Sequence, residues 1–169
     1  IDSIYVKHVT GTLTVDVSGV FYDSRTVKPG GIFCALRGEG RDGHEFIDAA
    51  LEKGAVAIIS EQPNPAAFAA TWLQVGDARA AMALAAANFE EQPSLEFPVI
   101  GVTGTNGKTT TTHLIHHVLQ SVLHRAGLVG TIQYSTGDAV EAAPHTTPES
   151  PDLQHLIRGQ TIVVHDELQ

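Results

Sequence analysis

The first half of the chain alternates short apolar runs with turn signals. Residues 19–25 (GVFYDSR) and 31–36 (GIFCAL) have the character of strands and are separated by a Lys-Pro-Gly-Gly turn. Residues 45–53 place apolar side chains at helical spacing, and Gly54 is suited to end that helix. Residues 55–60 (AVAIIS) form an apolar run typical of a buried strand. This order of strand, helix and strand predicts a small mixed α/β domain.

The pattern then continues through one more strand and an alanine-rich helix to a linker. Residues 71–75 (TWLQV) are strand-like, and Asp77 stands where it can cap the alanine-rich helix that follows. Residues 92–98 (QPSLEFP) have two prolines and little periodicity, so they are the best linker candidate. We therefore predict an N-terminal domain over residues 1–91 and a second domain over residues 92–169.

The second domain begins with another unit of strand, helix and strand. Residues 97–103 (FPVIGVT) form an apolar strand, which is followed by the Gly-rich turn GTNGK. The next residues, up to Gly127, predict a helix whose apolar face holds Leu114, Ile115, Val118, Leu119 and Val122. Residues 128–135 (LVGTIQYS) predict the next strand, and a helix from Ser150 and a final strand complete an α/β pattern.

The turn between strand and helix carries candidate chemistry. The general phosphate-binding pattern is G-x-x-x-x-G-K-[ST]; Gly107, Lys108 and Thr109 satisfy its second half, but Val102 occupies the position of the first glycine. Backbone N–H groups at a helix N-terminus converge on an anion, and glycine lets the backbone approach it closely. Lys108 supplies a cation for phosphate oxygens, and Thr109 offers a hydroxyl to Mg²⁺. This context favours a nucleotide site over a plain Gly-rich turn.

Two charged loops in the first half can each be interpreted without a ligand. In the Asp-Ser-Arg turn at residues 23–25, Asp23 can accept local N–H bonds and pair with Arg25, which by itself describes a charged turn. The Gly-rich segment 37–46 (RGEGRDGHEF) is either a solvated loop or a second anion site, built from backbone N–H groups and Arg37 or Arg41.

Composition narrows the possible partners. The 169 residues include 10 basic and 19 acidic side chains, and the net charge of −9 argues against nucleic acid and anionic membranes as partners. A single cysteine excludes an intramolecular disulfide and a multi-cysteine zinc site. The sequence shows no secretory-signal pattern and no apolar run long enough for a transmembrane helix. We therefore expect a cytoplasmic protein that neither binds nucleic acid nor inserts into membranes.

Taken in order, these motifs resemble the Mur ligase family. Residues 19–60 are similar to the N-terminal domain shared by its MurE and MurF branches, and GVTGTNGKTTTTH resembles its ATP loop, whose glycines fall where residues 101, 104 and 107 have them. GLVGTIQYSTG followed by HTTPESPDLQHL is similar to the MurE branch, the UDP-N-acetylmuramoyl-tripeptide synthetases. The MurF branch usually lacks the TTP element, and folylpolyglutamate synthases carry GTNGKGS instead of GTNGKTT.

The resemblance implies a small mixed α/β UDP-binding domain, followed by the start of a P-loop NTPase-like parallel-sheet domain. It also implies two substrate sites. Lys108 would contact phosphate and Thr109 would face Mg²⁺, and the ATP loop as a whole would comprise Gly104, Thr105, Asn106, Gly107, Lys108, Thr109 and Thr110. The residues that would contact the UDP-linked substrate are Tyr22, Ser24, Glu39, Gly40, Arg41, His145, Thr146 and Thr147.

The implied reaction is an ATP-dependent amide ligation by a monomeric enzyme with ATP and Mg²⁺ as cofactors. The D-glutamate carboxylate of UDP-MurNAc-L-Ala-D-Glu would form an acyl phosphate, and a diamino acid, meso-diaminopimelate or L-lysine, would displace the phosphate. The family's E-V-S-S-H element, carbamylated lysine and C-terminal amino-acid-binding domain do not occur in this sequence. We therefore expect nucleotide binding without complete turnover, with a MurF-type ligase and a non-catalytic UDP- or ATP-binding fragment as alternatives.

Overall fold

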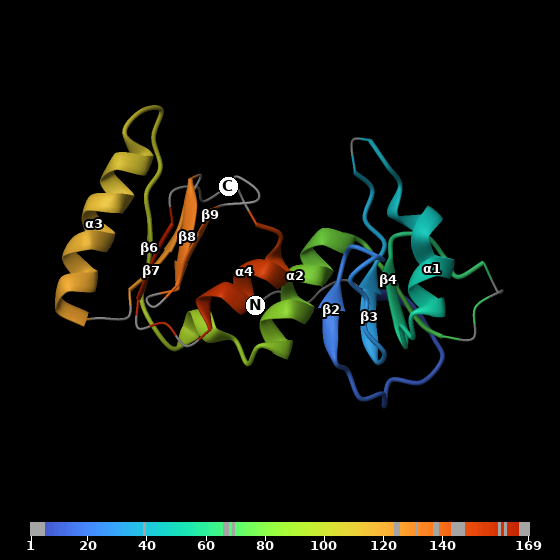
Figure 1. The fold of residues 1–169 in the computed structure, drawn as a ribbon. Coiled ribbons are helices and arrows are strands. Elements are labelled where there is room, and N and C mark those ends of the chain that lie inside the picture. The colour runs from blue at the N-terminus through green and yellow to red at the C-terminus, as the bar shows by residue number, and fades with distance from the viewer. Residues whose placement is uncertain are drawn as a thin grey trace. The chain divides into compact units, whose positions relative to one another are not determined.

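The computed structural model divides the chain into two compact units, Ile1–Phe89 and Glu90–Gln169, each built around one five-stranded sheet (Figure 1). The residues that the structure describes are 6–38, 40–65, 68, 70–123, 126–130, 132–136, 139–142, 148–158, 160 and 162–165. Within these ranges, every helix is too short or too polar to cross a membrane.

The first unit is a mostly parallel sheet with helices on both faces. Its strands are β1 (Val6–Thr10), β2 (Gly19–Phe21), β3 (Gly31–Cys34), β4 (Ala57–Ser60) and β5 (Thr71–Val75). Its helices are the 3₁₀ turn η1 (Gly43–Phe46), α1 (Ile47–Glu52) and α2 (Ala78–Phe89). The strand order is β1-β5-β4-β3-β2; β1 pairs antiparallel with β5, and all other pairs are parallel.

Alternation along the strands gives this sheet two separate cores. Phe33, Ile58 and Trp72 stand beside one another in the strand register, and all three pack into the cluster that contains α1. The next residues along β3 and β4, Cys34 and Ile59, pack into the cluster that contains α2. In Figure 1, α1 and α2 accordingly lie on opposite sides of the sheet. Strands buried on both faces explain the continuous apolar runs in the sequence.

The second unit has a parallel core extended by an antiparallel hairpin. Its elements are η2 (Pro93–Leu95), β6 (Val99–Gly101), α3 (Lys108–Leu123), β7 (Ala126–Val129), β8 (Gln133–Thr136), β9 (Val140–Ala142), α4 (Ser150–Ile157) and β10 (Ile162–His165). The strand order is β6-β10-β7-β8-β9, and β10 pairs in parallel with both β6 and β7. The α/β fold class with parallel sheets is thus confirmed.

The single strand predicted over residues 128–135 is wrong. The structure has two antiparallel strands here, with Val129 of β7 opposite Tyr134 of β8. The backbone N–H of Gly130 donates to the carbonyl of Gln133 at 3.2 Å, so the chain turns between them. The sequence predicts one strand here because the apolar run continues across the tight turn. Hydrophobic periodicity alone does not show where the backbone reverses direction.

The helix α3 does not bury the apolar face predicted for it. Thr112 is fully buried, and Ile115 and Leu119 are half-buried, so this side of the helix faces strands β7 and β10. Much of the predicted apolar face is instead exposed, with relative exposures of 64% for Leu114, 61% for Val118 and 69% for Val122. Helical spacing identifies a stripe of residues, but the packing partner decides which side is covered.

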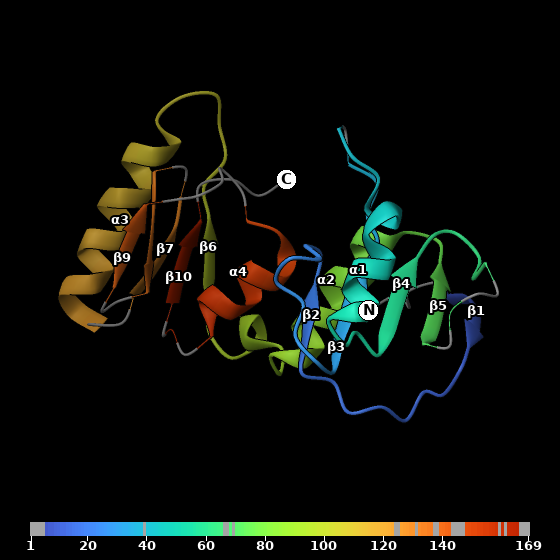
Figure 2. The same cartoon turned by 45° about the vertical axis from the view of Figure 1, so that its right-hand side comes forward.

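The opposite face of the second sheet is covered by α4 (Figures 1 and 2). Ile157 packs with Val129 and Val163 in the core of this unit. The buried carboxylate of Glu90 accepts a 2.8 Å hydrogen bond from Arg158 Nη1 and lies 3.3 Å from His155 Nδ1. These contacts tie the start of the unit to the C-terminal end of α4.

Candidate functional site

The Gly-rich loop joins the carboxyl end of β6 to the first residue of α3. The strand β6 ends at Gly101, and α3 begins at Lys108, so the loop residues 102–107 lie at a helix N-terminus. The backbone N–H of Val102 donates to the carbonyl of His165 at 2.8 Å, which ties the start of the loop to β10. Strand, turn and helix thus stand in the arrangement that binds phosphate with backbone N–H groups.

Two glycines give this loop its shape. Gly104 has φ +150° and Gly107 has φ +80°, a backbone region that disfavours residues with a side chain. A Cβ atom at Gly107 would meet nothing within 4 Å, so the requirement there is conformational and not steric. The predicted roles of Gly104 and Gly107 in a phosphate loop fit this backbone geometry.

Lys108 folds back over the loop. Its Nζ donates to the carbonyl of Gly104 at 2.9 Å, which places the ammonium group at the loop and not along the outside of the helix. Thr105 and Asn106 are exposed in the same loop. A phosphate bound by this loop would replace the Gly104 carbonyl as the hydrogen-bond acceptor of the Lys108 ammonium group.

The four threonines that follow have different surroundings. Thr109 is half-buried next to Lys108, and Thr110 and Thr111 are exposed. Thr112 is buried, and its hydroxyl donates to the carbonyl of Thr109 at 2.9 Å. Thr112 therefore has a structural role inside the helix, and Thr109 is the threonine whose position suits a ligand.

The strand β10 completes the surroundings of the loop. It lies between β6 and β7, and its last residue, His165, stands beside Gly101 and Val129 in the register. His165 is buried, with 4% of its surface exposed. This strand, which comes last in the sequence, therefore lies second in the sheet, between β6 and β7, and ends next to the Gly-rich loop.

A second group of predicted residues lies in the first unit, at the carboxyl edge of its parallel strands. The Asp-Ser-Arg turn follows β2, and a hairpin around residues 37–42 follows β3. Because the carboxyl ends of parallel strands meet at one edge of a sheet, these loops share that edge.

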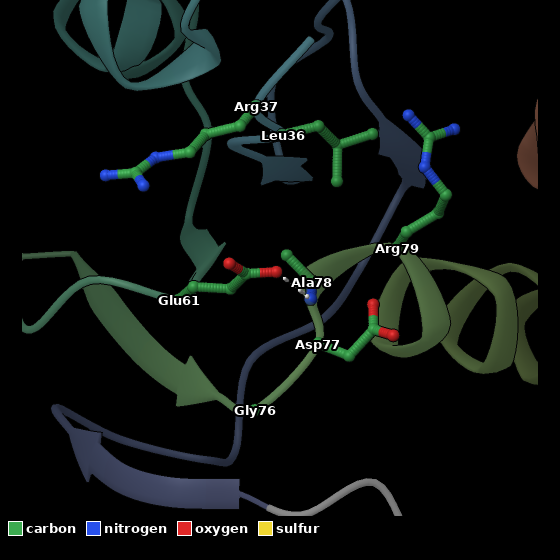
Figure 3. Close-up of a pocket in the computed structure, with 7 residues that line it drawn as sticks. All are labelled: Leu36, Arg37, Glu61, Gly76, Asp77, Ala78 and Arg79. Carbon is green, nitrogen blue, oxygen red and sulfur yellow. Dashed lines mark hydrogen bonds between the residues drawn. The ribbon is translucent and has the colours of Figure 1, made fainter.

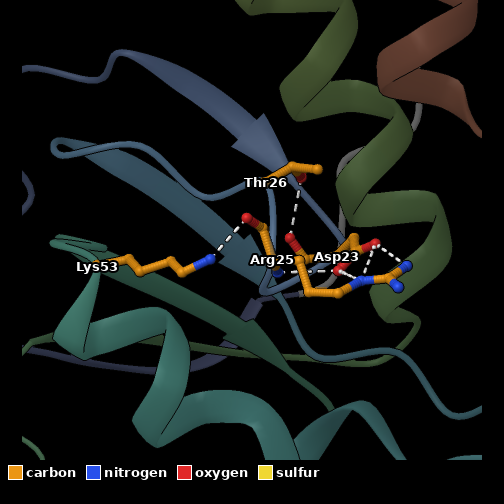
Figure 4. A network of polar contacts seen from close by, with 4 residues as sticks. All are labelled: Asp23, Arg25, Thr26 and Lys53. Carbon is orange, nitrogen blue, oxygen red and sulfur yellow. Dashed lines mark hydrogen bonds and ion pairs between the residues drawn. The ribbon is translucent and has the colours of Figure 1, made fainter.

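The Asp-Ser-Arg turn is held together by its own charges (Figure 4). Asp23 accepts hydrogen bonds from the Arg25 backbone N–H at 2.9 Å and from Arg25 Nη2 at 2.6 Å. Thr26 Oγ1 donates to the Asp23 carbonyl at 3.0 Å, and Lys53 Nζ donates to the Arg25 carbonyl at 2.6 Å. Asp23 and Arg25 thus shape the turn, and Ser24 lies between them. Tyr22, just before the turn, packs against the core under α2.

The hairpin after β3 is short and well anchored. Arg37 and Asp42 form an isolated antiparallel β-bridge, and the Gly38 N–H donates to the Arg41 carbonyl at 3.0 Å. The Nε atom of Arg37 lies 3.7 Å from Asp42 Oδ2, and Gly40 and Arg41 at the tip are exposed. The hairpin therefore presents two arginine side chains at the carboxyl edge of the sheet.

A pocket of about 350 Å³ opens beside this hairpin. Figure 3 shows its lining residues, which are Leu36, Arg37, Glu61, Gly76, Asp77, Ala78 and Arg79. The N-terminus of α2 at its base is already bonded to carboxylates: Glu61 Oε1 accepts from Ala78 N–H at 3.1 Å, and Asp77 Oδ1 accepts from Ala80 N–H at 2.9 Å. The predicted cap at Asp77 is confirmed, and two side chains of the pocket, Arg37 and Arg79, carry positive charge.

The structure thus places the predicted residues in two groups. Residues 104–110 lie together at the start of α3, and Tyr22, Ser24, Gly40 and Arg41 lie at the carboxyl edge of the first sheet. Four predicted residues are outside the described part of the chain, namely Glu39, His145, Thr146 and Thr147.

Sequence reasoning missed the polar residues that support the hairpin. His44 Nδ1 lies 2.5 Å from Asp42 Oδ1, and His44 Nε2 lies 2.7 Å from Ser60 Oγ at the end of β4. The tripeptide Asp-Gly-His was visible in the sequence, but its partner at the end of another strand was not.

The Asp23–Arg25 pair predicts an acid-sensitive contribution to stability. The hydrogen bond from the Arg25 side chain holds the pKa of Asp23 below its usual value. Its stabilisation is therefore present above about pH 4, the ordinary range of aspartate, and is lost as the pH falls through the lower folded-state pKa. We expect Asp23→Asn to lower the free energy of unfolding at about pH 7 by a small amount, because solvent screens the pair, and to lower it less at about pH 2. Urea unfolding at the two pH values measures this, and an equal loss at both would contradict it.

Two family models match this chain in order. Residues 16–90 match the model described as Mur ligase family, catalytic domain. Residues 102–162 match the model of the Mur ligase middle domain. The first match contains the Asp-Ser-Arg turn and the segment 37–42, and the second contains the Gly-rich loop before α3.

Named relatives agree with these matches. The UDP-N-acetylmuramoyl-L-alanyl-D-glutamate–2,6-diaminopimelate ligase of Geobacter metallireducens is 50% identical over 152 residues, which are 88% of this chain and 29% of that protein. The ligase of the same name from Geobacter sulfurreducens is 49% identical over 150 residues, 89% of this chain and 30% of that protein. The chain therefore spans less than a third of the length of these relatives.

Solved structures show the same fold. A structure of a UDP-N-acetylmuramoyl-L-alanyl-D-glutamate–2,6-diaminopimelate ligase is 29% identical, with a TM-score of 0.68 over 88% of this chain and 31% of that one. The MurF ligase from Thermotoga maritima, solved in complex with ADP, is 25% identical, with a TM-score of 0.59 over 91% of this chain and 33% of that one. Matched by two Mur ligase models in succession and by relatives of up to 50% identity, the chain belongs to the Mur ligase family.

Proposed function

We propose that this chain is the UDP-substrate-binding and ATP-binding region of a MurE-type ligase. The full reaction joins a diamino acid, meso-diaminopimelate or L-lysine, to UDP-MurNAc-L-Ala-D-Glu in peptidoglycan precursor synthesis. The observation that carries the proposal is the loop that ends in Lys108 and Thr109 at the start of α3, in a chain 50% identical to a ligase named for that dipeptide substrate.

ATP binds, in this proposal, to residues 104–110. The N–H groups of the loop and of the first turn of α3 face the β- and γ-phosphates, where the helix dipole adds a favourable field. The Lys108 ammonium group, which now bonds to the Gly104 carbonyl, moves to the phosphate oxygens. The ADP complex of the Thermotoga maritima MurF ligase supports a nucleotide in this family fold.

The residues at the start of α3 also fit Mg²⁺. Mg²⁺ is usually held by few protein oxygens together with phosphates and water, and the hydroxyl of Thr109 is such an oxygen. Among the described residues there is no cluster of three acidic, histidine or cysteine side chains that could hold a metal instead. When bound, the ion neutralises charge on the transferring phosphoryl group.

The UDP-linked substrate occupies the carboxyl edge of the first sheet. Ser24, presented between Asp23 and Arg25, and Tyr22 contact the uridine nucleotide in this proposal. Glu39, Gly40 and Arg41, which follow in the sequence after β3, line the same site. The three remaining predicted contacts to the substrate are His145, Thr146 and Thr147.

The chemistry that follows is phosphoryl transfer and then amide formation. An oxygen of the D-glutamate carboxylate bonds to the γ-phosphorus as the bond to the bridging oxygen breaks and ADP leaves. The amine of the diamino acid then bonds to the acyl carbon, phosphate leaves, and the amine gives up a proton. The residues of this chain contribute positioning and charge neutralisation, because both reactants are anionic. We place the enzyme in the cytoplasm as a monomer.

Isothermal titration of the chain with three ligands tests this function. We expect UDP-MurNAc-L-Ala-D-Glu to bind more tightly than the corresponding UDP-MurNAc-tripeptide, because the MurE step consumes the dipeptide. ATP–Mg²⁺ should bind as well. Tighter binding of the tripeptide would contradict the MurE assignment and favour a MurF-type ligase. If neither UDP compound binds, the proposed UDP site is wrong.

A further inference from the structure

A continuous chain of hydrogen bonds runs from the hairpin into the sheet of the first unit. The His44 backbone N–H donates to Asp42 Oδ1 at 3.0 Å, and the His44 ring nitrogen Nδ1 lies 2.5 Å from the same oxygen. On the other side of the ring, Nε2 lies 2.7 Å from Ser60 Oγ. Ser60 is the last residue of β4, so these hydrogen bonds link the loop after β3 to the end of the neighbouring strand.

Each polar side chain of this hydrogen-bond network has a partner. A carboxylate can only accept, so the proton between Asp42 and His44 belongs to Nδ1; in the neutral imidazole, Nε2 then accepts from the Ser60 hydroxyl. Ser60 Oγ in turn accepts from the Gln62 backbone N–H at 2.9 Å. Buried polar networks in which every member is satisfied favour one well-defined geometry.

The order of Asp, His and Ser is that of a nucleophilic triad, but the burial excludes that use. Ser60 has 0% of its surface exposed, so its hydroxyl does not reach a substrate. The His44 side chain is 13% exposed, which leaves little room for a reacting group beside the ring. The network is therefore suited to hold its surroundings in place and not to perform chemistry.

Other contacts fix the stem of the hairpin next to this network. Gly43 N–H donates to the Leu36 carbonyl at 2.8 Å, and a Cβ atom at Gly43 would lie 2.6 Å from that oxygen. The strands of the stem thus approach so closely that only glycine fits. At the tip, by contrast, a Cβ atom at Gly40 would meet nothing within 4 Å, so the tip has room for a ligand.

We propose that Asp42, His44 and Ser60 are positioning residues that hold the 37–42 hairpin in the geometry that receives the diphosphate-bearing end of the UDP-linked substrate. The inference rests on the proposed function for the identity of the ligand. The network fixes the stem, and the stem directs Arg37 and Arg41 at the carboxyl edge of the sheet. A loop that is ordered before binding loses less entropy when the ligand arrives, so the network contributes to affinity without touching the ligand.

The test compares His44→Phe and the milder Ser60→Ala with a matched control, Thr71→Val. Thr71 lies at the other end of the sheet, where its hydroxyl donates to the Thr12 carbonyl at 2.7 Å, so the control also removes one buried hydrogen bond. We expect both network variants to weaken binding of UDP-MurNAc-L-Ala-D-Glu by roughly tenfold in titration calorimetry. Their affinity for ATP–Mg²⁺ should stay unchanged, and Thr71→Val should lower the melting temperature without changing either affinity.

Amide hydrogen exchange provides a readout that needs no ligand. The N–H groups of Gly38 and Gly43, which close the hairpin, should exchange faster in His44→Phe and Ser60→Ala than in Thr71→Val. The double variant should weaken substrate binding no more than His44→Phe alone, because the residues act as one unit.

The two proposals fail in different ways. If the unsubstituted chain does not bind the UDP-linked dipeptide, the proposed function is wrong. If it binds and the two network variants bind equally well, or if their exchange at Gly38 and Gly43 matches that of Thr71→Val, the positioning role is wrong and the proposed function stands. Equal weakening of substrate binding by Thr71→Val would also overturn the positioning role.

Discussion

We expect Lys108→Ala to weaken ATP–Mg²⁺ binding by roughly 30- to 150-fold, since charge-assisted hydrogen bonds to phosphate contribute about 2 to 3 kcal/mol. In the free protein the ammonium group already lies at the loop, 2.9 Å from the Gly104 carbonyl, so little rearrangement precedes its use. Alanine is a strong helix former, and α3 should therefore still begin at this position. Titration calorimetry with ATP–Mg²⁺ measures the change.

The matched control for this experiment is Lys28→Ala. Lys28 is exposed in the turn before β3, and its loss changes the net charge by the same amount. Binding of UDP-MurNAc-L-Ala-D-Glu should be unchanged in both variants. Unaltered ATP affinity in Lys108→Ala would overturn the assignment of the loop, and an equal loss in Lys28→Ala would show that overall charge, and not the position of Lys108, controls nucleotide binding.

The shape of the Gly-rich loop before α3 could be predicted from sequence because its parts are contiguous. A strand, two glycines, a lysine and a helix follow one another, and positive φ at Gly104 and Gly107 is what that spacing requires. The N-cap at Asp77 is equally local, since its side chain bonds to an N–H group three residues later. Interactions within a few residues depend little on the rest of the fold, so these predictions needed no knowledge of the packing.

The placement of β10 could not be predicted in this way. The segment is recognisably a strand, but nothing in its own residues shows that it pairs with β6 on one side and β7 on the other. The same applies to α3, whose regular spacing marks an apolar stripe although Thr112 is the residue that is buried. Strand order and the buried side of a helix depend on partners distant in sequence.

The Asp42–His44–Ser60 network shows the same limit at the level of a site. Asp42 and His44 are neighbours in sequence, and their contact could have been proposed from a local turn. Ser60 is 16 residues away, and it meets His44 only because β3 and β4 are adjacent parallel strands that end at the same edge. Sequence motifs therefore identify candidate ligand loops more readily than the residues that contact those loops from elsewhere in the fold.

We expect Trp72→Ala to lower the free energy of unfolding of the first unit by about 3 to 5 kcal/mol, the usual range for removing a buried aromatic side chain. Trp72 is 2% exposed and stacks on Phe68, with ring centroids 5.8 Å apart and an interplanar angle of 7°. Its Nε1 also donates to the Gln62 carbonyl at 3.0 Å. Urea unfolding followed by circular dichroism measures the loss without relying on Trp72 fluorescence.

Trp72→Phe separates the two contributions of this side chain. Phenylalanine keeps most of the buried ring but removes the donor to Gln62, so we expect a loss of about 1 to 2 kcal/mol. Gln62 N–H also bonds to Ser60 Oγ, so freeing the Gln62 carbonyl loosens the segment on which the hairpin network depends. Trp72→Phe should therefore weaken binding of the UDP-linked dipeptide while most of its stability is kept. Equal stability losses in the two variants would show instead that the hydrogen bond, and not ring burial, dominates at this position.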